Sequence, residues 1–496
     1  MNTHRNFING QWLHARAERT FEDRNPATGE LLGRFPLSDS HDVDAAVQAA
    51  RGALEAWSAI PAPRRGDLLF RVAERLTRDI RQLGELVVRE MGKSLKEGIA
   101  DVQEAIDLAY YMGSETRRMF GHTTPSELPQ RLVMTVRVPV GVVGAITPWN
   151  FPIGIIALKL MPALAAGNTV VLKPAEDTPL CAGRFIEILA ECGIPPGVVN
   201  LVHGTGEQAG KALVEHPGVD LISFTGSSVV GAEIAQTCGR MHKRLCMELG
   251  GKNAIVILDD ADITNALTGV AWAAFGTSGQ RCTATSRLIV QEELLGKVTE
   301  ELAARASALK IGNHMGGNAV DVGPLVSAQQ LERVSSYVEI GRKEGARVVT
   351  GGARATAGEL ARGHFFQPTV FANVRPDMRI AQEEIFGPVI AVMPAKDDED
   401  ALRILNGVNY GLSCAVFTRD IDRALRFVEK ARAGVVYVNS HTIGAEAHVP
   451  FGGMKKSGNG TREGGWTAMD IYSEWKVIYA DYSQRLQRPM LDLIEA

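Results

Sequence analysis

The feature that most constrains this chain is a regular alternation of short apolar segments and helical patterns near its centre. Four segments with the composition of β-strands start at residues 169, 198, 221 and 245, and are therefore 29, 23 and 24 residues apart. Helical patterns lie between them, at residues 180–192, 208–216 and 229–238. Consecutive βαβ units produce this spacing, so the sequence predicts a parallel, doubly wound sheet.

A second alternating stretch follows, from about residue 255 to residue 438, with strand candidates at 288–290, 415–417 and 435–438. The pair Gly250-Gly251 ends the last strand of the first stretch, so the junction between two lobes is expected there. Upstream, residues 7–12 read as a short β-segment, long helical patterns follow, and residues 136–147 are predicted to be strand. The whole chain is predicted to be an α/β protein.

The net charge excludes two classes of function. The chain has 53 basic and 57 acidic residues, which gives a formal net charge of −4. No basic surplus exists to neutralise phosphates, so neither a general nucleic-acid binder nor a protein that adheres to anionic membranes is expected. The most apolar window, residues 151–172, is interrupted by Lys159, Pro162 and Asn168, and is expected to be buried rather than to span a bilayer.

The expected compartment is the cytoplasm. The first twelve residues lack the apolar core of a signal peptide. The six cysteines are scattered without a Cys-x-x-Cys pair, so neither a disulfide framework nor a zinc knuckle is predicted. Both observations favour a reducing compartment.

Glycine-bearing turns lie at the ends of several predicted strands. They are Gly204-x-Gly206-x3-Gly210, Gly226-Ser227-x3-Gly231 and Gly250-Gly251. In a strand–glycine–helix turn, backbone N–H groups can face a phosphate, although each of these turns alone also suits an ordinary connection. Ser227 is more informative, because it can cap the following helix and donate to a phosphate oxygen.

A charged pair follows the first strand of the alternation, in Lys173-Pro174-Ala175-Glu176. A carboxylate just beyond the carboxyl end of a strand can accept both hydroxyl groups of an adenosine ribose, and a lysine beside it can share that contact. A solvated ion pair in a loop is the alternative that this motif leaves open.

Cys282 has the most unusual neighbours of the six cysteines, in Gly279-Gln280-Arg281-Cys282-Thr283. Polar flanking residues are not typical of a core cysteine, and the charge of Arg281 can favour a thiolate. A base must then come from elsewhere. Glu248 ends an otherwise apolar strand, so it is either paired structurally or has a raised pKa suited to general-base catalysis.

Seven motifs together carry a family resemblance. In sequence order they are Pro148-Trp149-Asn150-Phe151-Pro152, Lys173-Pro174-Ala175-Glu176, Phe224-Thr225-Gly226-Ser227, Glu248-Leu249-Gly250-Gly251-Lys252, Gly279-Gln280-Arg281-Cys282, Glu383-Glu384-Ile385-Phe386-Gly387-Pro388 and Pro450-Phe451-Gly452-Gly453. With these motifs in this order, the chain resembles the aldehyde dehydrogenase superfamily over essentially its whole length. The resemblance implies an NAD(P)-dependent enzyme that oxidises an aldehyde to a carboxylic acid.

The resemblance also implies a Rossmann-like cofactor domain, a second α/β catalytic domain and a small β oligomerisation element. Residues 1–122 and 141–249 would bind the dinucleotide, residues 250–452 would form the catalytic domain, and residues 123–140 and 474–496 the oligomerisation element. The β-rich segment 475–482, with residues 134–138 as the hairpin beside it, is expected to pair with another subunit's sheet, because an isolated strand leaves unpaired N–H and C=O groups. A homodimer or homotetramer is expected.

The catalytic roles that the resemblance implies fall on three residues. Cys282 would be the nucleophile, Asn150 the side-chain donor of the oxyanion hole, and Glu248 the base that activates the water for deacylation. The chemistry is consistent: a thiolate attacks the carbonyl, fixed donors stabilise the oxyanion, hydride leaves to the nicotinamide, and water cleaves the thioester.

Implied contacts with the dinucleotide come from both halves of the chain. Lys173 and Glu176 would hold the adenosine ribose, and Glu384 the nicotinamide ribose. The remaining contacts would come from Trp149, Gly206, Gly226, Ser227, Leu249 and Phe386. Because the carboxylate of Glu176 occupies the place of a 2′-phosphate, NAD is expected to bind better than NADP, with Lys173 offsetting part of the difference.

The loop at residues 440–449 departs from the family pattern. Many relatives carry aromatic side chains there, whereas this chain has imidazole as its only ring. A substrate with a polar or charged far end is therefore expected, such as a carboxylated or amino-acid semialdehyde, with Arg281, Glu446 and His448 as candidate contacts. His441, Glu446 and His448 lack a further ligand nearby, so no metal site is predicted.

Two alternative functions are weighed against this one. A CoA-acylating dehydrogenase would use the same cysteine, but such relatives typically lack the base at the position of Glu248. A non-catalytic cofactor-binding homologue would be expected to lose Cys282, Glu248 or Asn150, and the chain retains all three.

Overall fold

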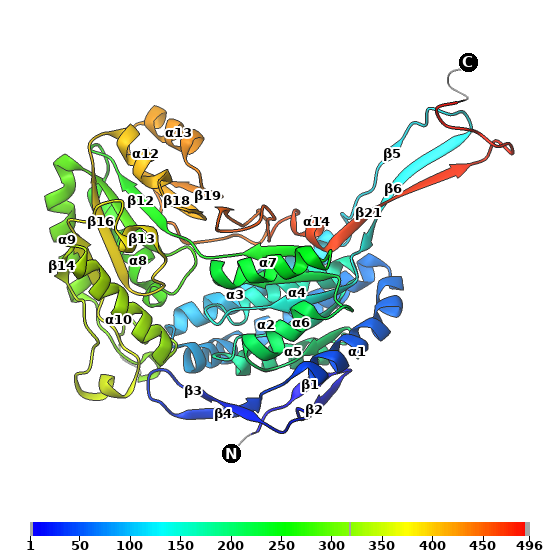
Figure 1. Ribbon diagram of the computed structural model, residues 1–496, viewed down its shortest axis with the longest axis horizontal. Coiled ribbons are helices and arrows are strands. Elements are labelled where there is room, and N and C mark those ends of the chain that lie inside the picture. The colour runs from blue at the N-terminus through cyan, green and yellow to red at the C-terminus, as the bar shows by residue number, and fades with distance from the viewer. Residues whose placement is uncertain (1–2, 317–318, 492–496) are drawn as a thin grey trace.

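The computed structural model describes residues 3–316 and 319–491, and it contains two seven-stranded sheets with helices packed on them (Figure 1). The strand order of the first sheet is β11-β10-β7-β8-β9-β1-β2, and that of the second is β14-β15-β16-β13-β12-β18-β19. The fold is therefore α/β, as predicted. None of the described helices is long and apolar enough to cross a membrane.

The first sheet confirms the predicted doubly wound arrangement. Five neighbouring strands, with β11 at one edge, are parallel: β7 (Val142–Ile146), β8 (Thr169–Lys173), β9 (Val199–Leu201), β10 (Leu221–Thr225) and β11 (Arg244–Glu248). After β9 the chain returns to the other side of β7, so the strand order reverses between β7 and β10. The antiparallel strands β1 (Asn6–Ile8) and β2 (Gln11–Leu13) extend the sheet beyond β9.

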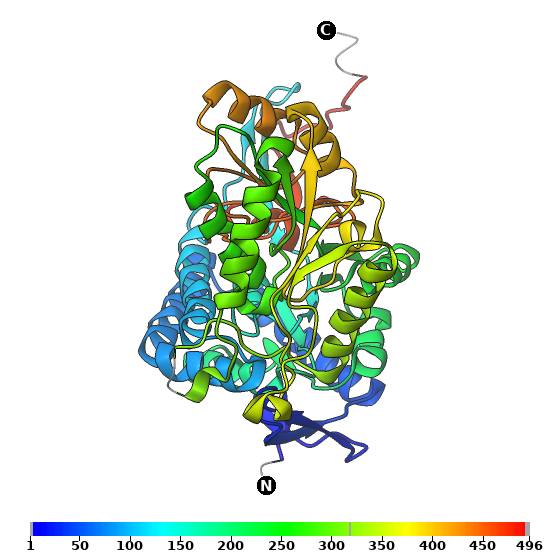
Figure 2. The same cartoon turned by 90° about the vertical axis from the view of Figure 1, so that its left-hand side faces the viewer.

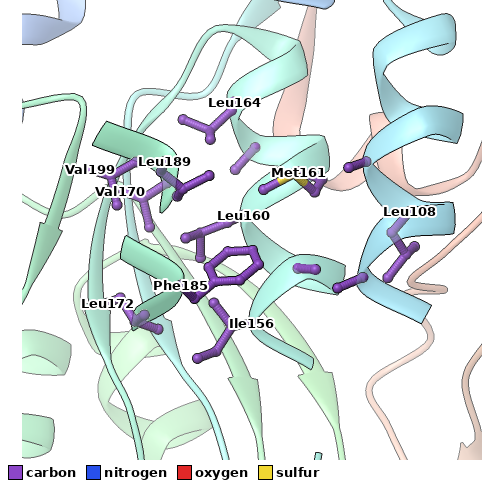
Figure 3. Packing of buried hydrophobic residues seen from close by; sticks show 14 of the residues in the cluster. Leu108, Ile156, Leu160, Met161, Leu164, Val170, Leu172, Phe185, Leu189 and Val199 are labelled. Atoms are coloured by element: carbon purple, nitrogen blue, oxygen red, sulfur yellow. The ribbon is translucent and has the colours of Figure 1, made fainter. Parts of the chain in front are cut away.

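Helices cover both faces of the first sheet. They are α1 (Ser40–Ala59), α2 (Ala62–Met91), α3 (Leu95–Glu115), α4 (Gly154–Ala166), α5 (Pro179–Glu191), α6 (Lys211–Glu215) and α7 (Ser228–Arg240). Helix α4 is apolar on nearly all sides because it lies in the core: Leu160 and Phe185 meet in one layer, and Leu108 of α3 lies on the other side of the helix (Figure 3). The apolar window of the sequence is thus buried in a globular core, as predicted.

The second sheet is also largely parallel. Its strands are β12 (Asn253–Ile257), β13 (Thr285–Gln291), β15 (Thr369–Ala372), β16 (Val389–Ala395), β18 (Ser413–Phe417) and β19 (Val435–Val438), with β14 (Arg347–Thr350) antiparallel at one edge. Its helices are α8 (Ile263–Phe275), α9 (Leu295–Ala308), α10 (Ala328–Lys343), α11 (Arg379–Gln382), α12 (Asp398–Asn406) and α13 (Ile421–Lys430).

The two sheets face each other through the ends of their strands. The side of a sheet at which its parallel strands end is called its carboxyl edge, and the side at which they begin is called its amino edge. Strand β11 ends at Glu248 and β12 begins at Asn253, so only four residues carry the chain from one sheet to the other. Because both strands run in the parallel direction of their own sheet, the carboxyl edge of the first sheet faces the amino edge of the second. A hydrogen bond of 3.2 Å from Asn150 Nδ2, after β7, to Gln280 O, before β13, joins these edges.

A third sheet projects from the body as an arm, at the opposite end of the molecule from the two-stranded sheet of β3 (Thr20–Arg24) and β4 (Leu31–Pro36) (Figures 1 and 2). The arm consists of β5 (Thr123–Thr124), β6 (Arg131–Pro139) and β21 (Ser473–Asp481). Strand β21 pairs antiparallel with β6 along its whole length. Residues 492–496 of the predicted oligomerisation element lie outside the described residues.

One of two predictions about the strands near the arm needs correction. Residues 136–147 are not one strand: β6 ends at Pro139 and β7 begins at Val142, in a different sheet. Between them Gly141 has a φ of +136° and breaks the extended backbone. Residues 134–138 lie in β6, which pairs antiparallel with β5 on one side and with β21 on the other, so the predicted hairpin does lie beside the C-terminal strand.

The chain returns to the first sheet before the arm. Strand β20 (Met454–Lys455) pairs with β17 (Tyr410–Gly411), and α14 (Ala468–Tyr472) then packs into the first core. Tyr472 is fully buried there, and its hydroxyl donates to Ser223 Oγ at 3.0 Å. Residues that follow the second sheet in sequence therefore complete the hydrophobic core of the first sheet.

Candidate active site

The predicted site residues gather where the two sheets face each other. Residues that follow strands of the first sheet come from its carboxyl edge: Trp149, Asn150, Lys173, Glu176, Gly226, Ser227 and Leu249. Those that precede strands of the second sheet come from its amino edge: Cys282, Glu384 and Phe386. In open α/β sheets the ligand crevice lies outside the carboxyl ends at the point where strand order reverses, which here is between β7 and β10.

Cys282 follows a turn with an unusual backbone. Thr277, Ser278 and Gly279 have φ values of 51°, 56° and 69°, three left-handed residues in succession. Such a conformation costs a non-glycine residue roughly 1–2 kcal/mol, so surrounding contacts must hold it. Gly279 is required for a second reason, because a Cβ there would lie 2.1 Å from the carbonyl oxygen of Gly387.

The surroundings of Cys282 favour the protonated thiol. Burial raises its pKa to about 12, and the charges of Glu248 and Glu384 act in the same direction. A thiolate must therefore form as part of the reaction, since the resting site disfavours it.

Arg281 lacks the free charge expected from the sequence. Its Nη2 atom lies 2.9 Å from Glu97 Oε1, its Nε donates to Thr277 Oγ1 at 2.9 Å, and its side chain is 6% exposed. The guanidinium also lies over the ring of Trp272. Because of these contacts the guanidinium offers no free charge to a substrate carboxylate, and its charge acts on Cys282 only against the opposing charge of Glu97.

Glu248 is buried without a partner. Within the described residues neither of its carboxylate oxygens has a hydrogen bond. Burial raises its pKa well above the ordinary value, and the nearby charge of Glu463 adds to the effect. Of the two readings that the sequence left open, the structure has the unpaired carboxyl with a raised pKa. Gly452 leaves room for it, since a Cβ there would lie 2.5 Å from Glu248 Oε1.

A buried polar network lies behind Glu248. Glu463 Oε1 accepts from Lys159 Nζ at 2.8 Å and from Ser223 Oγ at 3.2 Å, with all three side chains buried. Cys246 also donates to this oxygen, at 3.4 Å. One oxygen of Glu463 therefore has three donors, whereas neither oxygen of Glu248 has any within the described residues.

The first sheet presents a polar ligand site at its carboxyl edge. Ser227 is the N-cap of α7, as predicted, with its Oγ accepting from the Val230 N–H. Within the described residues, the buried hydroxyls of Thr147 and Thr225, at the ends of β7 and β10, have no hydrogen-bond partner. Because buried polar atoms in proteins are almost always paired, orphan hydroxyls at this position suit a polar ligand such as a dinucleotide.

Lys173 and Glu176 form an ion pair that is buried at one end. Lys173 Nζ lies 2.9 Å from Glu176 Oε2, and the side chains are 4% and 42% exposed. The lysine is therefore fixed by the core, while the carboxylate it orients remains open to a ligand.

The second sheet brings Glu384 and Phe386 to the same crevice. Glu384 Oε1 accepts from the Gly251 N–H at 2.9 Å, and burial raises the pKa of this carboxyl above its ordinary value. Phe386 packs edge-on against Trp149 with ring centroids 5.3 Å apart. Leu249 is buried against Gly231 on the other side.

Three predicted residues stand apart from this cluster. Gly206 is exposed, begins a short π-helical turn, and has space for a Cβ with nothing within 4 Å. Glu446 and His448 form an exposed pair with Nε2 and Oε2 3.5 Å apart. Among the residues that the structure describes, no hydrogen bond or ion pair joins these three to Cys282.

Two residues near Cys282 were not predicted. Burial raises the pKa of Tyr437 to about 12 with a contribution from the Cys282 charge, so this ring of β19 places an aromatic group near the thiol, whereas the loop at residues 440–449 has only imidazole. Burial raises the pKa of Glu104 to about 7, and its charge acts on Cys282 as well. The spacing of Glu97, Asp101 and Glu104 on α3, one face of a helix, was the available signal.

Comparisons with known proteins agree with this geometry. The sequence profile of the aldehyde dehydrogenase family matches residues 12–478. The chain is 40% identical to an alpha-ketoglutaric semialdehyde dehydrogenase of Bacillus subtilis over 96% of this chain and 98% of that protein. It is 42% identical to an alpha-ketoglutarate semialdehyde dehydrogenase of Haloferax volcanii over 96% and 99%.

A solved structure matches as well. The betaine aldehyde dehydrogenase of Staphylococcus aureus in complex with NAD+ superposes with a TM-score of 0.95 at 34% identity, covering 97% of this chain and 95% of that one. Fold and site thus define a two-sheet α/β protein with a cysteine and a carboxyl at its central crevice. The chain belongs to the aldehyde dehydrogenase family.

Proposed function

We propose that this protein oxidises an aldehyde to a carboxylic acid with NAD, using Cys282 as nucleophile. The observation that carries the proposal is the meeting of a half-buried thiol and a buried, unpaired carboxyl where the two sheets face each other. The test is the appearance of reduced cofactor at 340 nm with an aldehyde panel, with and without CoA. A requirement for CoA would favour the acylating alternative, and no reduction with any aldehyde would favour a non-catalytic homologue.

The proposed mechanism assigns a step to each of three residues. The Cys282 thiol releases its proton to water and Sγ bonds to the carbonyl carbon, while the Asn150 amide and the Cys282 N–H donate to the oxyanion that forms from the carbonyl oxygen. When bound, NAD supplies the acceptor for the hydride that leaves this carbon. Glu248 then takes a proton from a water molecule that attacks the thioester, and the acid product leaves the thiol free.

The proposed cofactor is NAD, and NADP is expected to bind less well. The residues of the crevice fit a dinucleotide through the Ser227 cap, the unpaired hydroxyls and the Glu176 carboxylate, and the S. aureus relative holds NAD+. A 2′-phosphate would meet the charge of Glu176. Steady-state kinetics with both cofactors tests this preference, and a higher kcat/KM with NADP would contradict it.

A carboxylated semialdehyde is the proposed substrate class, supported by the names of the B. subtilis and H. volcanii relatives. Arg281 is not proposed as its partner, because Glu97 already neutralises it. A panel of carboxylated, neutral and cationic aldehydes of equal length tests the class by kcat/KM. A higher value for long alkyl aldehydes than for every carboxylated semialdehyde would contradict it.

We also propose a homodimer or homotetramer assembled through the arm. Strand β21 presents Trp475, Val477 and Tyr479 to solvent, 46–59% exposed, and it lies at the edge of its sheet. Strand β19 is likewise an edge strand. Two such edges can pair across subunits and satisfy their backbone groups. Light scattering of a chain ending after Lys476 tests the proposal, and an unchanged oligomer would contradict it.

We propose that the two seven-stranded sheets and the sheet of the arm each belong to a domain with its own function. Residues 1–122 and 141–249 would bind the dinucleotide, residues 250–452 would supply the nucleophile, and residues 123–140 with 474–496 would join subunits.

The proposed location is the cytoplasm. All six cysteines are free thiols, which supports a reducing compartment.

A further inference from the structure

The turn before Cys282 cannot hold its shape alone. Its residues Thr277, Ser278 and Gly279 are all left-handed, and Thr277 is β-branched. Contacts from other parts of the chain must therefore select this conformation. Ser278 Oγ donates to Gly323 O at 2.8 Å, and Gln280 Nε2 donates to Thr277 O at 3.2 Å. Both are neutral hydrogen bonds.

The charged contacts of the turn converge on one atom. Glu97 Oε1 accepts from the Thr277 N–H at 2.8 Å, from Thr277 Oγ1 at 2.9 Å and from Arg281 Nη2 at 2.9 Å. Arg281 Nε donates to Thr277 Oγ1 at 2.9 Å, which closes a ring around the turn. Glu97 and Arg281 are both buried. Two ends of the same tight turn are thus joined through a carboxylate 180 residues away in sequence.

The same helix also holds the loop that carries Asn150. Glu97 Oε2 is fixed at the start of α3 by the N–H and Oγ of Ser94, at 3.0 and 2.9 Å. One turn further along, Asp101 accepts from the Gly154 N–H at 2.6 Å and pairs with the buried Lys93 at 2.8 Å. One face of α3 therefore supports both the turn before Cys282 and the segment just after Asn150.

We propose that Glu97 is a positioning residue for the nucleophile: it clamps the left-handed turn so that Cys282 faces Asn150, and it neutralises the arginine next to the thiol. The inference rests on the proposed function only in taking Cys282 as the nucleophile. Glu97 acts through Thr277 and Arg281 and takes no part in bond making.

Neutralisation has a consequence that a purely structural role would lack. Cys282 is faced by Arg281 beside it, by Glu248 from β11, by Glu384 from the loop before β16, by Glu104 from α3 and by Tyr437 from β19. Of these groups only Arg281 is positive, and the Glu97 carboxylate, 2.9 Å from its Nη2 atom, opposes its effect on the thiol. Without the Glu97 carboxylate, the guanidinium would stabilise a Cys282 thiolate.

The experiment compares Glu97→Gln, which keeps the shape and removes the charge, with Glu97→Ala, which removes both. The full-length protein is assayed for turnover, and the alkylation of Cys282 by iodoacetamide is followed by mass spectrometry from pH 6 to 10. Ser94→Ala is the matched control, because it removes the Oγ contacts of Ser94 while the backbone N–H at position 94 still holds Glu97 Oε2 and the Oε1 contacts stay in place.

Opposite changes in the two measurements are expected. Glu97→Ala should lower kcat by about 100-fold through misplacement of the thiol, and Glu97→Gln by about tenfold. Both should speed alkylation at pH 7 by about tenfold, because the thiol pKa falls. Ser94→Ala should change neither. If Glu97→Ala does not fold, Glu97→Gln carries the test.

Two results would overturn the proposal. One is a Glu97→Gln variant with wild-type turnover and alkylation, and the other is a Ser94→Ala variant that reproduces both changes. A wild-type protein without aldehyde oxidation would instead contradict the proposed function, and the alkylation comparison would still decide whether Glu97 controls Cys282.

Discussion

The carboxyl edges of the two sheets are built from the same kind of parallel strands. In the part of the chain that the structure describes, only the first has unpaired polar groups that are available to a ligand, so it is called the open edge and the other the closed edge. At the first, β7 and β10 end in threonines whose buried hydroxyls lack partners within the described residues. At the second, Arg423 binds Asp398 through Nε and Nη2 at 2.8 and 2.6 Å, and Asp259 through Nη1 at 2.7 Å. Parallel topology offers a ligand crevice at both edges, and the pairing of polar groups decides which edge is a site.

The second sheet contributes to the site through its other edge. The segments before β13 and β16 carry Cys282 and Glu384, and burial raises the pKa of both groups. Reactive groups with perturbed pKa values therefore collect at an amino edge, while the ligand-facing backbone belongs to a carboxyl edge. The comparison predicts that changes at the facing edges alter the reaction, and that changes at the closed edge alter stability alone.

The largest expected effect is at Cys282. Cys282→Ala should lower aldehyde oxidation by more than about 1,000-fold, because the covalent step is lost. NAD affinity, measured by calorimetry, should stay within about twofold of wild type, since the dinucleotide crevice is untouched. Cys192→Ala, at the end of α5, is the control and should be fully active. Wild-type turnover in Cys282→Ala would show that the amino edge of the second sheet does not supply the nucleophile.

The second largest effect on turnover is expected at Glu248, where the chain leaves the first sheet for the second. Glu248→Gln should give a burst of reduced cofactor and then a steady rate about 100-fold lower, because the thioester is no longer hydrolysed. A carboxyl with a raised pKa is protonated at low pH, so the wild-type steady rate should rise with pH as Glu248 loses its proton. Stopped-flow absorbance at 340 nm from pH 5 to 9 would test both points. An unchanged pH dependence in the variant would contradict the assignment.

A change at the closed edge should affect stability only. Arg423→Ala should lower the free energy of unfolding by about 2 kcal/mol through the loss of charged hydrogen bonds, with kcat unchanged. Burial would raise the pKa of Asp260, but its bonds with Thr418 and Arg419 and the Arg423 charge outweigh it, and the pKa is lowered. The stabilisation is therefore present above the unfolded pKa and is lost as pH falls through the folded one.

Urea denaturation at pH 7 and pH 3.5 measures this difference. The gap in stability between wild type and Arg423→Ala should be smaller at pH 3.5, where Asp260 begins to protonate. A fall in kcat without a fall in stability would mean that the second carboxyl edge is also a functional site.

The smallest expected effect compares two serine caps. Ser227→Ala should raise the KM for NAD about fivefold and lower stability by about 1 kcal/mol, because Ser227 caps α7 at the open edge. Ser327→Ala removes the equivalent cap of α10, beside the second sheet, and should cost similar stability without changing KM. Equal KM values in the two variants would show that Ser227 serves the helix alone.

Much of the fold was predictable because it depends on local pattern. The spacing of strands predicted the doubly wound sheet, and β19 has the predicted bounds. The cap at Ser227 joins two residues only three positions apart, Ser227 and Val230, and was predicted as well. The division of residues 136–147 between two sheets was missed, since composition alone does not tell where an extended segment changes its partner. Only the distant partners of β6 and β7, namely β21 and β8, establish the boundary.

By itself the sequence determined which chemical groups lie at the two facing edges. Strand periodicity and turn residues locate the strand ends, and the reactive side chains lie within a few residues of those ends. Tertiary structure alone decided the electrostatic state of those groups. Arg281 is neutralised by Glu97 from a helix 184 residues away, whereas Glu248 is left unpaired beside a Glu463 that Lys159 stabilises. A pKa depends on burial and on the nearest charge in space, and both are set by packing between segments that no local pattern relates.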